Sequence, residues 1–470
     1  MNASDRALSD AVASERNATL PGVSLSRWTM SYFAAGLMSF ALAQGLMVAG
    51  YGYPHAPVEA PETLALVHLI ALGWLSLLLC GALFQFVPVL VAKPLHDNAM
   101  PLPTLVCLLI GLLALLLGFL QLGGQISLSL PFFPVAATLL VLGFTLVLWN
   151  LGRTLWAARP LPLPARFVVT GLFGIAGTVF LGAIFALVLG GATSHPHLIE
   201  LTARGVPIHA IAGLGGWLTL TAMGVSYRLL AMFMLAPELD RLSSRLAFHL
   251  GSGALAVAFV GGVVAICFEW RLDFPLLTAA LLGLGALALY GKDMLFLYRA
   301  RKRRTLELNS RMAAFALLSL VLAAALVVVT IARGDLSTHA PAIVYLVAFG
   351  WLSGLGLAKL YKIVAFLTWL ECYGPVLGKM PTPRVQDLVV EPRAVKWFGL
   401  YFLAVWAGTA ALLFDYPGVF RAATALSLIA TVAIAMQLFR TRRLRDVEHA
   451  TAVAAGARRP RLLWSLSRQA

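Results

Sequence analysis

Five histidines are the residues of this chain best suited to chemistry. His68 and His209 each lie in the first turns of a long apolar segment, and His339 lies at the start of another. His195 and His197 form an H-x-H pair in a polar stretch between two apolar runs, where closely spaced imidazoles can hold copper or zinc. Imidazole also ligates heme iron, and a polar ring inside an apolar span is costly without a partner. These five residues are therefore the candidate metal ligands.

Each of these histidines also has an ordinary structural interpretation, which the sequence leaves open. His68 and His209 could be polar residues at the ends of helices, and the H-x-H pair could be a solvated loop. His68 lies six residues before Trp74, whereas His209 lies eight residues before Trp217. Two residues turn an α-helix by about 200°, so the two side chains need not face equivalent cavities.

Apolar helices must position these residues, because the composition is that of a membrane protein. The chain has 470 residues, of which 60% are hydrophobic and 12% charged, and its mean hydropathy is +0.88. Soluble domains are about 45–50% apolar and about 25% charged, so a water-soluble multidomain protein is excluded. The four cysteines form no C-x-x-C pair, and no nucleotide-binding or H-E-x-x-H motif is present. The first apolar run, from Trp28, is too long for the core of a cleaved signal peptide.

Windows of about 20 apolar residues predict twelve membrane spans and hence an all-α, polytopic fold. The predicted spans begin near Trp28, Thr63, Pro101, Leu130, Ala165, Pro207, Leu246, Phe274, Arg311, Pro341, Val395 and Gly418. The predicted organisation is an N-terminal tail over 1–27, one membrane domain over 28–440 and a basic C-terminal tail over 441–470.

The distribution of lysine and arginine predicts the orientation in the membrane. If the N-terminus is cytoplasmic, only Arg204, Arg271, Arg333 and Arg421 of the 35 basic residues fall on the outer side. The positive-inside rule therefore predicts cytoplasmic N- and C-termini and a multi-pass protein of a bacterial-type inner membrane, with the five candidate histidines at the outer side. The net charge of +15 then reflects topology and contact with anionic lipid of the bilayer, and we expect no nucleic-acid partner.

A Gly-Trp-Leu motif recurs in the second, sixth and tenth predicted spans. Its tryptophans, Trp74, Trp217 and Trp351, are separated by 143 and 134 residues, which is one recurrence per four spans. Close packing of small residues in lipid explains one such motif, but three at the same place in a four-span period indicate an internal repeat. The repeat predicts three four-helix arcs in a pseudo-threefold arrangement.

This pattern resembles subunit I of the heme–copper oxidases, and more closely the degenerate, NnrS-like members of that superfamily. The resemblance rests on the twelve spans, on His68 with GWLSL, on His209 with GWLTL and on the histidine-free GWLSG segment at Trp351. It implies that His68 ligates a heme and that His209 ligates heme or copper, and His339 could contribute from the rim of the tenth span. It also implies a partner in the respiratory chain.

The sequence departs from the oxidase pattern where a dioxygen-reducing centre would be built. The seventh span has His249 at its inner end in place of two adjacent outer histidines, and the tenth span has Tyr345 but no histidine. We therefore expect a heme-binding membrane protein, with copper as a second cofactor to test, that acts in respiratory, nitric oxide or metal metabolism. If it is an enzyme, the expected activity is a heme-dependent oxidoreductase and not a proton-pumping terminal oxidase. Two alternatives stay open: a twelve-span secondary transporter and a heme-free assembly factor for a respiratory complex.

Charged residues within the predicted spans are few, and most have an interfacial interpretation. Lys359 and Lys362 lie about 27–32 Å along the tenth span from Pro341, at 1.5 Å per residue. We expect both side chains to snorkel to the inner headgroups. Lys292 and Asp293 are expected to pair with each other or with a neighbour.

Overall fold

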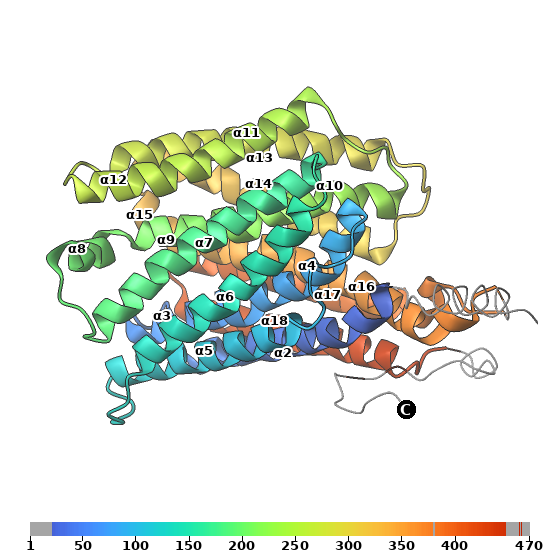
Figure 1. Cartoon of the computed structure of the whole chain (residues 1–470), viewed down its shortest axis with the longest axis horizontal. Helices are drawn as coiled ribbons and strands as arrows, with labels where there is room; N and C mark the ends of the chain where they lie inside the picture. The colour runs from blue at the N-terminus through green and yellow to red at the C-terminus, as the bar shows by residue number, and fades with distance from the viewer. Residues whose placement is uncertain (1–20, 379–380, 448–459, 461, 463–470) are drawn as a thin grey trace, which may run out of the picture.

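The chain forms a bundle of long helices, and the part that the computed structural model describes contains no strand. The described residues are 21–378, 381–447, 460 and 462, so the predicted tails fall largely outside them. Twelve helices in this part are long and apolar enough to cross a bilayer, which confirms the all-α membrane class. They run side by side along the long axis of the molecule, with their connections at its two ends (Figure 1).

We number the spans 1 to 12 in chain order. Spans 1, 3, 4, 5, 8, 9, 11 and 12 are single α-helices: α2 (Pro21–Ala49), α5 (Pro101–Leu122), α6 (Phe132–Trp156), α7 (Leu163–Leu189), α13 (Asp273–Arg299), α14 (Leu308–Arg333), α17 (Glu391–Leu413) and α18 (Pro417–Arg442). The other four spans each contain a π-helical segment between two α-helices.

Span 2 is α3 (Pro61–His68), η1 (Leu69–Ser76) and α4 (Leu77–Val91); span 6 is α9 (Val206–Ala210), η2 (Ile211–Leu220) and α10 (Thr221–Met234); span 7 is α11 (Leu242–Ala256), η3 (Val257–Gly261) and α12 (Gly262–Cys267); span 10 is α15 (Leu336–Tyr345), η4 (Leu346–Ser353) and α16 (Gly354–Tyr373). Three short helices lie between spans: α8 (Pro196–Arg204), η5 (Gly374–Val376) and η6 (Val385–Leu388).

Prolines mark several helix starts, because their missing N–H falls where a helix has no partner for it. Pro61, Pro101 and Pro417 each open a helix in this way. Pro341 behaves differently: the sequence places the start of span 10 there, but the helix begins at Leu336 and carries Pro341 inside it. A membrane helix tolerates such a proline because neighbouring groups compensate for the lost hydrogen bond.

Spans 2, 6 and 10 run in the same direction through the bundle. Figure 1 places α3, α9 and α15 at the end where α8 lies, and α4, α10 and α16 at the opposite end. We call these the α8 end and the α16 end. The π-helical segments η1, η2 and η4 contact one another in the middle of the bundle.

The three repeated tryptophans fill the centre at which these segments meet. Trp74, Trp217 and Trp351 are at most 1% exposed. Trp74 Nε1 donates to Ser353 Oγ at 2.8 Å, and Trp217 Nε1 donates to Ser76 Oγ at 3.0 Å. Span 2 is thus bonded to span 10, and span 6 to span 2. Trp351 Nε1 has no hydrogen-bond partner among the described residues.

The π-helical segments determine which side chains reach the centre. A π-helix closes each hydrogen bond over five residues instead of four, so each residue turns the chain by less than it does in an α-helix. Such segments are usually a single turn found at functional sites, whereas η1 and η4 have eight residues and η2 has ten. In spans 2 and 6 the π-helical segments lie between the candidate histidines and the tryptophans. They therefore change the direction in which the histidine side chains point relative to the tryptophan side chains.

Candidate metal site

The structure brings His68 and His209 together near the α8 end. Their ring centroids lie 6.2 Å apart, and the ring planes are inclined by 39°. His68 is the last residue of α3, and His209 lies in α9 just before η2. From the sequence, we expected that the His68 and His209 side chains need not face equivalent cavities. That expectation assumed an α-helix from each histidine to the tryptophan that follows it. The intervening residues are mostly π-helical, so that estimate of the turn does not apply.

The His68 ring is oriented by its own helix. Its Nδ1 lies 2.7 Å from the carbonyl oxygen of Leu64. Because a carbonyl oxygen only accepts, Nδ1 carries the proton, and the lone pair of the neutral ring is on Nε2. Metal-binding histidines are commonly held by such a hydrogen bond from the second nitrogen. The ring of Phe119 packs against His68, with the centroids 5.3 Å apart.

The His209 ring packs into a space that a glycine leaves open. A Cβ atom at Gly182 of α7 would lie 3.0 Å from His209 Cε1, and the Phe185 ring lies 5.5 Å from the His209 ring. His209 Nδ1 is buried and has no hydrogen-bond partner among the described residues. An unsatisfied buried nitrogen costs about 1–3 kcal/mol, and the backbone of Thr178 in α7 lies close enough to the ring to offset part of that cost.

The spacing of the two rings discriminates between kinds of metal centre. With a metal–nitrogen bond of about 2.0–2.1 Å and about 1.1 Å from nitrogen to ring centre, opposite ligands place their ring centres about 6.3 Å apart. Tetrahedral ligands, as in structural zinc sites, place them about 5.1 Å apart. The 6.2 Å between the His68 and His209 ring centres is nearer to the spacing of opposite ligands than to that of tetrahedral ones, and it also lies within the range of about 4.5–7 Å of ordinary ring pairs.

The other candidate ligands lie in separate places. His339 Nε2 is 3.5 Å from the carboxylate of Asp335, which also binds Arg333 at 3.0 Å. His195 and His197 have their rings 5.5 Å apart and are exposed, at the start of α8. Over the described ranges, no group of three or more His, Cys, Asp and Glu side chains is arranged to hold a metal.

Two cavities allow a test of whether a porphyrin fits beside the histidine pair. One lies between spans 5 and 7, and the other lies between α5, α6 and the end of α7; neither is lined by His68 or His209. The pair therefore matches the axial ligands of a heme in spacing, but neither of these hollows would take the ring. A single ion between the two rings requires no such hollow.

Lys359 is buried, contrary to the expectation that it snorkels to the surface. Its side chain is only 7% exposed, and Nζ has no hydrogen-bond partner among the described residues. The closest ring is that of Phe233 in span 6, whose centroid lies 5.3 Å from Nζ. Span 10 is the most enclosed of the twelve, so a lysine on its inner face cannot reach the headgroups.

Lys362, one turn further on, has a partner outside the spans. Its Nζ lies 2.8 Å from a carboxylate oxygen of Glu307, which also pairs with Arg303. Burial opposes ionisation of Glu307, but the hydrogen bond and charge of Lys362, followed by those of Arg303, outweigh it and lower the pKa of this carboxyl. This network ties the start of span 9 to span 10.

Asp293 is satisfied without a cation. Its carboxylate accepts hydrogen bonds from Tyr227 at 2.9 Å and from Ser243 at 2.6 Å, and the side chain is 2% exposed. Of the two expected pairings, the one with a neighbour is found and the one with Lys292 is not among its contacts. Asp293 thus joins spans 6, 7 and 8 near the α16 end.

No protein-family model matches the sequence, and a search of the curated proteins finds no match. The fold and the site therefore define the class on their own: a polytopic, α-helical membrane protein with a histidine pair between spans 2 and 6.

Proposed function

We propose that this chain is an integral membrane metal-binding protein in which His68 and His209 would together hold one metal centre, heme iron or copper. The observation that carries the proposal is the 6.2 Å between the two rings, together with the hydrogen bond that leaves Nε2 of His68 available. Neither of the two cavities described above adjoins the pair, and a single copper ion, unlike a porphyrin, needs no cavity there. The role, as the resemblance implies, is in respiratory, nitric oxide or metal metabolism.

When bound, either metal would supply one-electron redox chemistry. The residues of the chain position and shield it. The Leu64 carbonyl fixes the tautomer and direction of His68, and Gly182 allows His209 to pack closely on span 5. Phe119 and Phe185 each pack against one of the two rings, and both histidines are half-buried. A pair of imidazoles does not make a dioxygen-reducing centre, so the proposed function excludes proton-pumping terminal oxidation.

We also propose the pseudo-threefold arrangement of three four-helix arcs. It is supported by the mutual contact of η1, η2 and η4 and by two equivalent indole–hydroxyl bonds, from Trp74 to Ser353 and from Trp217 to Ser76. Secondary transporters are commonly built from two related six-span halves. A central structure that repeats every four spans favours the arc arrangement over that alternative.

The proposed topology places the α16 end in the cytoplasm of a bacterial-type inner membrane. Arg299, Arg303 and Arg442 lie at this end, and the basic bias of the loops there supports the assignment. The histidine pair then lies toward the extracytoplasmic side, where a respiratory redox partner has access to it.

The test is spectroscopy with metal analysis on the purified protein from cells supplied with heme and copper. We expect about one metal per chain, seen as a Soret band for heme or as copper by elemental analysis. The His68→Ala and His209→Ala variants should each lose at least tenfold in metal affinity, because changes to residues that only orient the ligands already cost about 10–100-fold. His339→Ala is the matched control and should retain the metal.

Two results would contradict the proposal. One is a folded wild-type protein, monodisperse by gel filtration, that contains neither a Soret band nor copper. The other is metal content that the His68 and His209 variants leave unchanged although they remain helical by circular dichroism.

A further inference from the structure

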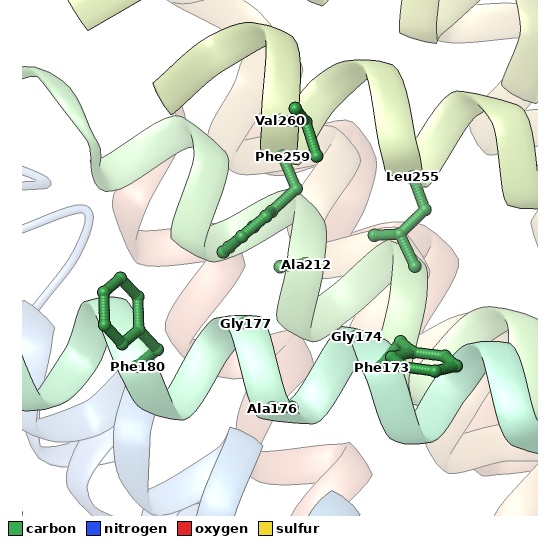
Figure 2. A pocket seen from close by; sticks show the side chains of 9 residues that line it. All are labelled: Phe173, Gly174, Ala176, Gly177, Phe180, Ala212, Leu255, Phe259 and Val260. Carbon is green, nitrogen blue, oxygen red and sulfur yellow. The ribbon is translucent and has the colours of Figure 1, made fainter. Parts of the chain in front are cut away.

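An apolar groove runs between spans 5 and 7 on the lipid-facing surface. It has a volume of about 400 Å³ and is lined by Phe173, Gly174, Ala176, Gly177, Phe180, Ala212, Leu255, Phe259 and Val260. Figure 2 shows Phe173 and Phe180 projecting from α7 at the two ends of the groove, with Leu255 and Phe259 reaching toward α7 from span 7. Ala212 of η2 forms its floor. The lining offers hydrocarbon contacts to an occupant.

The groove continues along one helical face to charged residues at the α16 end. On α7, Arg166, Thr170, Gly174 and Gly177 follow one another at spacings of three or four residues, which keeps them on one face. The Thr170 hydroxyl lies 3.2 Å from that of Ser252 and connects the two spans below the groove. The face therefore changes from charged to hydroxylated to apolar within three turns.

Span 7 repeats the same order of side chains. Arg245, Ser252, Leu255 and Phe259 follow one another at spacings of seven, three and four residues and share the face that meets α7. Arg245 makes a two-pronged ion pair with Asp240, at 2.8 and 2.9 Å. Two spans thus present an arginine at the same end of one groove.

The charges at this end are not balanced. The hydrogen bonds of Arg245, its charge and then the charge of nearby Arg166 hold the pKa of Asp240 below its usual range, so Asp240 is ionised and neutralises one of the two arginines. Arg166 makes no ion pair with a described acidic residue; its Nε donates to the carbonyl of Leu161 at 3.0 Å. Arg166 is thus left without an ion-pair partner among the described residues, where a lipid headgroup would lie.

We propose that this groove binds an anionic phospholipid, with its phosphate at Arg166 and one acyl chain between spans 5 and 7. At 1.5 Å per residue, Gly174 and Phe180 lie about 12 and 21 Å from Arg166 along α7. One leaflet of the hydrocarbon core is about 15 Å thick, so an acyl chain whose headgroup is at Arg166 reaches the groove. The charged and apolar parts of the site are therefore separated as they are in a lipid.

The shape of the groove excludes a helix as occupant. A Cβ atom on Gly177 would lie 2.6 Å from Phe259, so spans 5 and 7 touch at the base of the groove. A helix with side chains is about 10–12 Å wide and cannot enter between walls this close. A single hydrocarbon chain is narrow enough to enter, and it fits beside the small residues Ala176 and Gly177.

The test uses phosphatidylglycerol that carries a photoreactive diazirine on its acyl chain. The full-length protein in mild detergent is irradiated with this lipid, and the labelled peptides are identified by mass spectrometry. We expect the label on 173–180 and 255–260, and less of it when the probe has a phosphatidylcholine headgroup. Arg166→Gln should weaken phosphatidylglycerol binding about fivefold, from about 1 kcal/mol per basic residue.

Two further variants complete the test. Ala176→Phe fills the groove and should remove the acyl-chain label at these peptides for both headgroups. Arg443→Gln is the control, since Arg443 directly follows α18 at the same end of the bundle, is exposed, and contacts the ring of Phe439. Equal labelling with both headgroups, label spread over all spans, or cross-links between two copies of the chain would each overturn the proposal.

Discussion

The indole–hydroxyl bonds at the centre of the bundle make a quantitative prediction. Ser353→Ala leaves the buried Nε1 of Trp74 without an acceptor, and Trp74→Phe removes that donor. Hydrogen bonds between membrane helices contribute about 0.6 kcal/mol on average and at most about 1.7 kcal/mol. We therefore expect a double-mutant cycle of these two changes to give a coupling of about 0.6–1.7 kcal/mol. The cycle of Ser76 with Trp217 should give a similar value, because the geometry is the same.

The third tryptophan is the control for this reasoning. Trp351 is as buried as Trp74, but its Nε1 has no partner among the described residues. Trp351→Phe removes similar volume without breaking a hydrogen bond, so it should destabilise the protein less than Trp74→Phe does. The assay is reversible unfolding in mixed detergent followed by far-UV circular dichroism. A coupling of zero in both cycles, or equal costs for Trp74→Phe and Trp351→Phe, would refute the account.

Two further predictions concern packing and pH. Gly81→Ala should destabilise the fold by about 1–3 kcal/mol in the same unfolding assay, because the added Cβ would lie 2.6 Å from Tyr32 Cβ. Gly45 has open space around it, so Gly45→Ala should be neutral or should stabilise the fold by up to about 1 kcal/mol. The hydrogen bonds of Arg440 and the charges around it lower the pKa of Asp446 below its ordinary value of 3.8. The ionised Asp446 carboxylate therefore stabilises the fold fully above pH 3.8. This stabilisation is lost as the pH falls through the lower pKa that Asp446 has in the folded protein. Asp446→Asn should reduce stability at neutral pH by about 1 kcal/mol and abolish that acid-dependent loss, measured as unfolding midpoints across the pH range.

The membrane fold was predictable because each span is a long apolar run. The predicted starts at Trp28 and Pro101 coincide with the hydrophobic stretches in the structure, and the largest discrepancy, at Pro341, arises because a proline can lie inside a membrane helix. Run length and hydropathy follow from local composition, so the sequence alone determines them. Which face of each helix points inward depends on packing, and that is where prediction failed.

The histidine site illustrates this limit. The residue types and the half of the span in which they lie were evident from the sequence, and His68 and His209 were named together. Their approach to 6.2 Å was not predicted, because the helical period of 3.6 residues does not hold through η1 and η2. A glycine next to each central tryptophan is the local feature that accompanies the π-helical stretch. The burial of Lys359 was missed for a related reason, since hydropathy does not show that span 10 is central.

The three buried indoles also have an electrical consequence. His68 lies six residues before Trp74, and Lys359 lies eight residues after Trp351, so about 20 Å of helix separates the levels of the two along the bundle. Trp74, Trp217 and Trp351 occupy the middle of this interval and leave little room for a water wire. The centre of the bundle is therefore closely packed between these two levels. A metal held at the histidine pair, as proposed, would exchange electrons and small ligands through the α8 end.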